Sequence, residues 1–170
     1  MNIKIDYRVK AKEIRKTLDI KKISIDLCDK LKKLPQYSDA RDIMLFYPMK
    51  YEIDVLSLMS EKNKNFYLPR IKGDILEVCP YKNGDTLEMS SFKTMEPISN
   101  AVEPSKLDIV VVPALMADKQ NYRLGYGKGF YDRFLNTTFA KSIVLIAKEL
   151  IVDKLPIEKH DKPVDFLITS

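Results

Sequence analysis

Apolar residues recur along the chain at two different spacings, which predicts both helices and buried strands. Residues 10–34 place apolar side chains near the 3.6-residue period of an amphipathic helix, at Ile14, Leu18, Ile25 and Leu31. Pro35 ends this pattern, so we predict one helix over residues 10–34. A second helix is predicted over residues 129–136, and one or two helical turns over residues 53–59.

Short apolar runs between prolines or polar residues predict the strands. Residues 107–112 form the clearest run, and their continuous β-branched sequence is typical of a central strand covered on both faces. Further strands are predicted over residues 42–47, 65–68, 142–147 and 166–169. Residues 75–81 and 85–92 flank Lys82-Asn83-Gly84, which has the chemistry of a hairpin turn.

The order of these elements predicts the fold class. Helices that alternate with buried strands indicate an α/β fold with a mainly parallel, mixed sheet flanked by helices. With 170 residues, the chain has the length of one compact three-layer domain and can bury a core without a disulfide or metal. We therefore expect a single domain over residues 1–170.

Composition narrows the class of protein. Hydrophobic residues make up 45% and charged residues 31%, as in ordinary globular proteins. No apolar run approaches the roughly 20 residues of a membrane span, and no secretory signal is visible. Cys28 and Cys79 are then expected to be free thiols in a reducing cytoplasm, so we predict a cytoplasmic protein with no membrane partner.

Positive charge is concentrated at the N-terminus. The chain carries 29 basic and 24 acidic residues, but residues 1–34 hold eleven of the basic and five of the acidic ones. Such a helix would suit nucleic acid, a membrane surface or a small anionic ligand, or it is simply a solvated helix face. A nucleic-acid-binding module is therefore an alternative function. The rest of the chain has a net charge of −1 and shows no recognised nucleic-acid motif, which argues against it.

A glycine cluster carries the strongest chemical signal. Gly125, Gly127 and Gly129 follow the strand at residues 107–112 and lead into the helix at residues 129–136. Glycines let backbone N–H groups approach a ligand, and Arg123 and Lys128 add positive charge, so the segment resembles a phosphate cradle. Its spacing fits neither a Walker A loop nor a Rossmann fingerprint. The alternative is a tight turn that needs glycine for geometry alone.

Two neighbouring features leave alternatives open. Asp132 in the first helical turn could interact with the helix dipole, or it could hold Mg²⁺ against phosphates. The aromatic residues around the loop could pack against the protein or stack on a planar heterocycle.

The loop resembles the signature of the 5-formyltetrahydrofolate cyclo-ligase family. That signature reads Tyr-Arg-Leu-Gly-x-Gly-x-Gly-Tyr-Tyr-Asp-Arg, and residues 122–133 match it, with Phe130 at the first Tyr of the Tyr-Tyr pair. Val112, Pro113 and Asp118 match the segment before it. Residues 47–54 and 160–169 are similar to two further segments of the family.

The resemblance implies an enzyme of one-carbon metabolism. It would convert 5-formyltetrahydrofolate to 5,10-methenyltetrahydrofolate with ATP as co-substrate and Mg²⁺, and release ADP and phosphate. Its partners would be a reduced formyl folate, polyglutamylated or not, and ATP. No nucleic acid would be bound, and we expect a monomer.

The resemblance also implies roles for individual residues. ATP would be bound by Arg15, Lys12, Arg123, Leu124, Gly125, Tyr126, Gly127, Lys128, Gly129, Phe130 and Tyr131. The folate would contact Tyr47, Glu52 and Tyr126, and the metal would be held by Asp132 and Asp161. The family's N-terminal Lys-x-x-x-Arg fits Arg15 as its second residue. Its first residue falls on Ala11, so Lys10 or Lys12 is expected to reach the phosphates instead.

Overall fold

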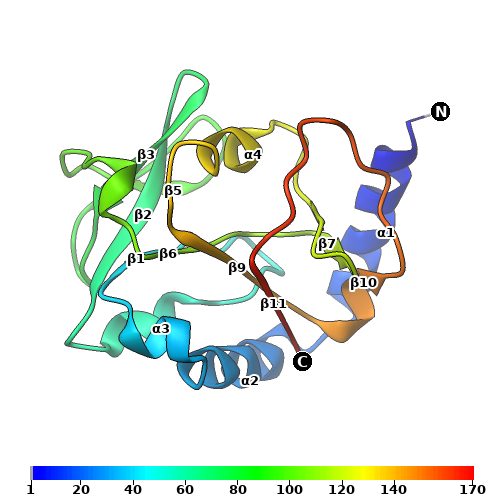
Figure 1. The fold of residues 1–170 in the computed structure, drawn as a ribbon, viewed down its shortest axis with the longest axis horizontal. Coiled ribbons are helices and arrows are strands. Elements are labelled where there is room, and N and C mark those ends of the chain that lie inside the picture. The colour runs from blue at the N-terminus through cyan, green and yellow to red at the C-terminus, as the bar shows by residue number, and fades with distance from the viewer. Residues whose placement is uncertain (1) are drawn as a thin grey trace.

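A six-stranded mixed sheet forms the centre of the molecule (Figure 1). The structure is a computed structural model and describes residues 2–170. The strand order is β11-β9-β6-β1-β2-β3, and every neighbouring pair is parallel except β2 with β3. The strands are β1 (Asp42–Met44), β2 (Asn65–Lys72), β3 (Ile75–Pro80), β6 (Ile109–Val111), β9 (Lys141–Ile146) and β11 (Phe166–Thr169).

Buried side chains on both faces of this sheet create three layers. On one face, Ile43 and Ile109 pack with Leu27 of α2 (Ile20–Lys32) and with α3 (Pro35–Asp39). On the other face, Met44 and Val110 pack beneath α1 (Ile3–Lys16) and α4 (Phe130–Phe134). The predicted α/β fold with a mainly parallel, mixed sheet is confirmed. Within residues 2–170, no helix combines the length and the apolar character needed to cross a lipid bilayer.

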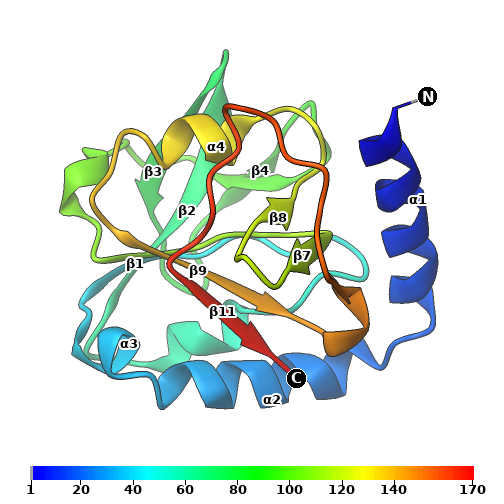
Figure 2. The ribbon, with the colours of Figure 1, turned by 45° about the vertical axis from the view of Figure 1, so that its right-hand side comes forward.

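Two smaller sheets lie outside the central one (Figure 2). One has the order β10-β7-β8, and the other pairs β4 with β5. Their bounds are β4 (Leu87–Met89), β5 (Met95–Pro97), β7 (Met116–Asp118), β8 (Arg123–Leu124) and β10 (Ile151–Val152). Three short 3₁₀ helices complete the chain: η1 (Leu56–Ser60), η2 (Pro104–Lys106) and η3 (Lys148–Leu150). No strand was predicted at β7, β8 or β10. The segment between residue 112 and the glycine loop, which contains β7 and β8, has the polar character of a loop.

The prediction of one helix over residues 10–34 is wrong. The chain forms α1 and α2 with a break at residues 17–19, and α1 begins at Ile3 rather than at residue 10. Asp19 begins α2, and its carboxylate accepts a hydrogen bond from the backbone N–H of Lys22 at 3.2 Å. Such a cap satisfies an N–H group that a helix start leaves free, so it stabilises a new helix at this point. The break was hidden because Leu18 keeps the helical spacing across it.

The predicted hairpin around Lys82-Asn83-Gly84 is also wrong. β3 pairs with β2 through a turn at Gly73, which has a φ of +61°, and β4 pairs with β5. The turn at residues 82–84 therefore joins two different sheets. Other predicted bounds also shift, since the helical turns predicted at residues 53–59 become the 3₁₀ helix η1 and the helix at residues 129–136 shortens to α4. Cys28 and Cys79 are buried free thiols, as predicted.

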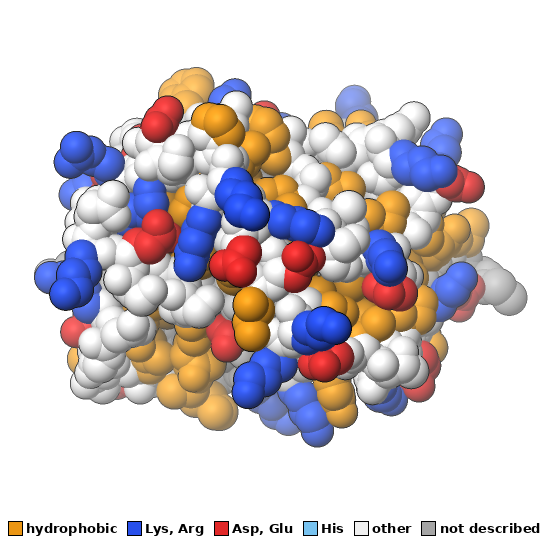
Figure 3. All heavy atoms as spheres, turned by 90° about the horizontal axis from the view of Figure 1, so that it is seen from below, with side chains coloured by type: hydrophobic (Ala, Val, Ile, Leu, Met, Phe, Trp, Pro, Cys, Tyr) orange, Lys and Arg blue, Asp and Glu red, His pale blue; other side chains and the backbone are white. Residues whose placement is uncertain are grey.

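The face beneath α2 and α3 carries both signs of charge. In Figure 3, which views the molecule from below, basic and acidic side chains are interspersed with apolar ones. Lys30 and Asp26 of α2, for example, lie 3.0 Å apart (Nζ to Oδ2). The lysines of α2 thus belong to a mixed, solvated helix face.

Candidate active site

A cavity of about 880 Å³ opens where β1 and β6 end. Phe46 follows β1 and Pro113 follows β6, and both line the cavity. Parallel strands present their carboxyl ends at one edge of a sheet, where α/β proteins commonly bind ligands. The cavity brings together most of the predicted site residues: Tyr47, Glu52, Arg123, Leu124, Gly125, Tyr126, Gly127, Lys128, Gly129, Phe130, Tyr131, Asp132 and Asp161.

The glycine loop needs its glycines for backbone conformation and close approach. Gly127 has a φ of +105° and Gly129 a φ of +71°, in the region that residues with a side chain rarely occupy. A Cβ on Gly127 would lie 3.3 Å from Cζ of Arg8. The helix that follows the loop, α4, has only five residues, so its dipole is smaller than that of the longer helix predicted over residues 129–136. Full positive charges at the loop come from the side chains of Arg123 and Lys128.

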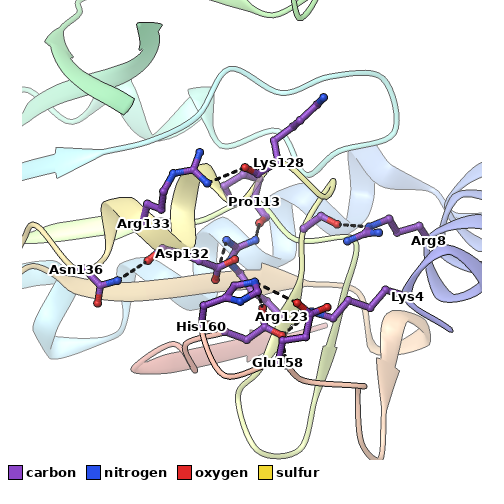
Figure 4. A network of polar contacts seen from close by, with 12 residues as sticks. Lys4, Arg8, Pro113, Arg123, Lys128, Asp132, Arg133, Asn136, Glu158 and His160 are labelled. Carbon is purple, nitrogen blue, oxygen red and sulfur yellow. Dashed lines mark hydrogen bonds and ion pairs between the residues drawn. The ribbon is translucent and has the colours of Figure 1, made fainter. Parts of the chain in front are cut away.

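Arg123 places a buried cation on the cavity wall (Figure 4). Its Nη1 donates to the carbonyl oxygen of Pro113 at 3.3 Å, and its Nη2 lies 3.7 Å from Oδ1 of Asp132. Within residues 2–170, its Nε has no hydrogen-bond partner. Burial lowers the pKa of Arg123, while the charges of Asp132 and Asp161 oppose that shift. A buried cation with so few partners suits an anionic ligand.

Asp161 lies in the C-terminal segment, where two hydrogen bonds fix its carboxylate. Its Oδ2 accepts from Nζ of Lys4 at 2.6 Å and from the N–H of Glu158 at 2.7 Å. Burial opposes ionisation of Asp161, but Lys4 and this N–H lower its pKa overall. His160 also lines the cavity, and its Nε2 lies 3.7 Å from Oδ1 of Asp161.

The residues described by the structure contain no group of three or more His, Cys, Asp or Glu side chains that could hold a metal ion. Asp132 and Asp161 nevertheless line the same cavity, and the negative charge of each raises the pKa of Arg123. Mg²⁺ usually takes one or two carboxylates and completes its shell with water and phosphate oxygens. The pair therefore fits Mg²⁺ that arrives with a polyphosphate, rather than a metal held by the protein alone.

The basic residues that α1 contributes to the cavity are Lys4 and Arg8. Arg8 donates from Nε to the carbonyl oxygen of Gly125 at 2.9 Å. Among the described residues, the cavity lining includes neither Lys12, which is exposed, nor Arg15, which is buried. Sequence reasoning missed Lys4 and Arg8 because it began the helix at residue 10. The signal was present, since the two residues themselves form a Lys-x-x-x-Arg pattern.

Arg15 instead belongs to a hydrogen-bonded chain that ends on Glu52. Its Nη1 donates to the hydroxyl oxygen of Tyr126 at 2.9 Å, and this hydroxyl donates to Oε1 of Glu52 at 2.9 Å. Glu52 exposes 5% of its surface. Burial raises the pKa of Glu52, and the Tyr126 hydrogen bond and the Arg15 charge reduce that rise.

The sheet of β4 and β5 supplies cavity residues for which the sequence held no signal. Phe92 lies in the turn between these strands and meets the Phe130 ring edge-on, with 5.7 Å between ring centres. The neighbouring Glu96 also lines the cavity. Part of the cavity is therefore built by a segment that is remote in sequence from the glycine loop.

Comparison with known proteins points to one family. A model of the 5-formyltetrahydrofolate cyclo-ligase family matches residues 7–170. The 5-formyltetrahydrofolate cyclo-ligase of Haemophilus influenzae is 30% identical over 148 residues, which are 79% of each chain. The mouse enzyme of the same name is 26% identical over 149 residues, which are 76% of this chain and 73% of the mouse protein.

Solved structures show the same fold. The NMR structure of a 5,10-methenyltetrahydrofolate synthetase from Aquifex aeolicus has a TM-score of 0.87 and 30% identity, and the match covers 98% of this chain and 89% of that chain. A synthetase structure from Mycoplasma pneumoniae has a TM-score of 0.79 over 99% of this chain and 98% of that one. At 21% identity, this second likeness concerns the fold alone.

Proposed function

This chain belongs to the 5-formyltetrahydrofolate cyclo-ligase family, and from that premise we propose that it converts 5-formyltetrahydrofolate to 5,10-methenyltetrahydrofolate with ATP and Mg²⁺, releasing ADP and phosphate. One observation carries the proposal. A single cavity of about 880 Å³ joins the glycine loop and its cations to the buried carboxylate of Glu52. That arrangement offers a phosphate-binding end and a hydrogen-bonding end within one space.

The proposed reaction needs activation of the formyl group. The N5-formyl group is amide-like, so its carbon is a poor electrophile and its oxygen a poor leaving group. The formyl oxygen attacks the γ-phosphorus, and ADP departs. N10 then attacks the activated carbon and loses its proton, and the C–O bond breaks to release phosphate. The protein mainly has to hold both substrates in register and neutralise the phosphate charge.

At the nucleotide end, we assign phosphate contacts to Lys4, Arg8, Arg123 and Lys128, which line the cavity around the glycine loop. Lys4 and Arg8 replace Lys12 and Arg15 in this role because they reach the cavity. Asp132 and Asp161 would hold Mg²⁺ together with the phosphates. When bound, the ion would offset negative charge on the phosphate oxygens.

At the folate end, we assign Glu52, Tyr47 and Tyr126. A buried carboxylate is a strong acceptor for the N–H donors of a pterin ring. Tyr47 and the ring of Tyr126 add aromatic surface beside it. The two ends are connected through Tyr126, which lies in the glycine loop and bonds to Glu52.

Product formation tests the proposal directly. Purified protein is incubated with 5-formyltetrahydrofolate, ATP and Mg²⁺, and the near-ultraviolet absorbance of the methenyl product is followed. We expect product only when all three components are present, and none after chelation of Mg²⁺ with EDTA. Circular dichroism of the same sample controls for folding. Folded protein that forms no methenyl product would contradict the proposed activity.

A further inference from the structure

We infer that Arg15 is a positioning residue for the folate half of the site. It orients the Tyr126 hydroxyl as a donor to Glu52 and keeps that carboxylate available as an acceptor. The identity of the ligand rests on the proposed function above. The contacts that carry the inference do not, because they join three side chains of this protein.

The direction of the hydrogen bonds follows from the groups involved. A guanidinium group can only donate, so the oxygen of Tyr126 must accept from Arg15. Burial raises the pKa of Tyr126, so its hydroxyl keeps its single proton. With Arg15 on the acceptor side, that proton points to Oε1 of Glu52. The carboxylate is thereby bonded on one oxygen. The backbone of Met49 adds a hydrogen bond that also favours the ionised carboxylate.

Arg15 acts through Tyr126 because it does not face the ligand space. It exposes 6% of its surface, and within residues 2–170 it forms no direct ion pair. Its Nη2 donates to the carbonyl oxygen of Ala114, which fixes the guanidinium beneath the segment that follows β6. A buried cation without a carboxylate in contact is costly to the fold. The nearest compensation along its contacts is the charge of Glu52, reached across the Tyr126 hydroxyl.

The same geometry sets the ionisation of Glu52. The titratable groups that shift it are Arg15 from α1 and Tyr126 from the glycine loop, and the Glu52 charge in turn raises the pKa of the neighbouring Tyr131 in α4. Burial raises the pKa of Glu52, whereas Tyr126 and Arg15 lower it. Arg15 therefore favours the ionised carboxylate, which accepts hydrogen bonds more strongly than the protonated acid. Removal of either partner should leave more of Glu52 protonated.

The test compares Arg15→Met, Tyr126→Phe and the double variant with the wild type. The titration of Glu52 is followed by NMR of ¹³C-labelled glutamate carboxyl groups. Binding of 5-formyltetrahydrofolate and of ATP is measured separately by calorimetry. We expect the Glu52 pKa to rise in both single variants, folate affinity to fall about tenfold, and ATP affinity to stay within about twofold. The double variant should match the weaker single variant, because both changes break one chain.

Arg70→Met is the matched control. Like Arg15, the Arg70 guanidinium is anchored by hydrogen bonds, in its case to Glu77 and to the carbonyl oxygens of Pro97 and Ser99, but it lies outside the cavity lining described by the structure. The Arg70→Met variant should leave the Glu52 titration and the folate affinity unchanged. A merely structural role for Arg15 predicts lower stability in both arginine variants and no shift in the Glu52 titration.

Unchanged Glu52 titration in Arg15→Met, or additive losses of folate affinity in the double variant, would overturn the inference. If Arg15→Met does not fold, Tyr126→Phe decides alone, since it removes one hydroxyl and keeps the ring. An unchanged Glu52 pKa in that variant would also overturn the inference. Failure of the wild type to turn over 5-formyltetrahydrofolate would reject the proposed function. The NMR titration would still test Arg15, because it requires no folate.

Discussion

Glu52 places a carboxylate where burial opposes its ionisation, and this has a consequence for stability. Its folded-state pKa is raised, so the folded state binds the proton more tightly than the unfolded chain. The unfolded glutamate has a pKa of about 4.3. As pH rises from there towards the raised pKa of folded Glu52, the contribution of Glu52 to the free energy of unfolding falls. Above that window the full cost of the buried charge is present.

We accordingly predict that Glu52→Gln separates stability from binding. At neutral pH the variant should melt at the same temperature as the wild type or higher, and this difference should shrink towards pH 4. Affinity for 5-formyltetrahydrofolate should fall roughly 10- to 150-fold, the equivalent of losing one charge-assisted hydrogen bond. Calorimetry and thermal melting from pH 4 to 8 measure both. Glu103→Gln, at an exposed glutamate, is the control. A destabilised variant with normal folate binding would contradict this assignment.

Single residues were predictable where their chemistry is local in sequence. The three glycines, the two cations and Asp132 all lie within residues 123–132, so residue types that are close in sequence indicated a candidate anion site. The role of Arg15 was not predictable in this way. Its partners Tyr126 and Glu52 lie 111 and 37 residues away in sequence, and neither spacing nor composition reports that they meet.

At the scale of elements, one face of α1 explains the basic N-terminus in part. Lys4, Arg8, Ala11 and Arg15 follow one another at intervals of four, three and four residues, so they share one side of the helix. Ala11 and Arg15 are buried there, while Lys4 and Arg8 reach the cavity. An analysis of apolar periodicity overlooks such a face, because the residues that point inward are mostly basic.

Because Arg8 lies on this face of α1 and Lys12 does not, we expect substitutions of the two residues to affect ATP binding differently. Arg8→Met should weaken ATP binding roughly 10- to 150-fold, because a charged donor beside the glycine loop is lost. Lys12→Met should leave ATP binding unchanged, since Lys12 is exposed and lies one residue past this face. Calorimetric titration with Mg²⁺-ATP measures both, and melting curves check the folding of each variant. Weaker ATP binding in Lys12→Met with normal binding in Arg8→Met would reject the assignment to Arg8 and support a phosphate contact from Lys12.

At the scale of the whole molecule, the cavity is assembled from distant parts of the chain. The N-terminus supplies Lys4, the loop after β1 supplies Glu52, and the C-terminal segment supplies Asp161 (Figure 4 shows Lys4 beside the C-terminal residues Glu158 and His160). Alternation of helices and apolar strands sufficed to predict the fold class. The strand order did not follow from it, because apolar spacing does not report which strands pair. The partner of β3 was missed because the short turn at Gly73 was overlooked in favour of the one at residues 82–84.

Asp118 holds two of these parts together. It is fully buried, and its Oδ1 accepts from the N–H groups of Gln120 and Tyr122 at 2.9 and 3.0 Å. Its Oδ2 accepts from the N–H of Leu155 at 2.9 Å. One carboxylate thus ties the turn between β7 and β8 to the segment that leads to Asp161. The backbone bond from Val164 to the carbonyl oxygen of Asn121, at 2.8 Å, joins the same two segments again.

We predict that Asp118→Ala lowers stability and also raises the Mg²⁺ concentration that turnover requires. Three N–H groups, one buried and two partly buried, would lose their acceptor, at a cost of about 3 kcal/mol. For a chain of this length that corresponds to a fall in melting temperature of about 6–12 °C. Because the C-terminal segment would lose one of its anchors, the Mg²⁺ concentration needed for half-maximal turnover should rise at temperatures where the variant is folded. Asp108→Ala is the control, since this exposed carboxylate accepts from the N–H groups of Arg41 and Asp42, away from the cavity lining. It should lose less stability and keep the wild-type Mg²⁺ dependence. An Asp118 variant that melts early yet keeps that dependence would mean that the second backbone bond alone places Asp161.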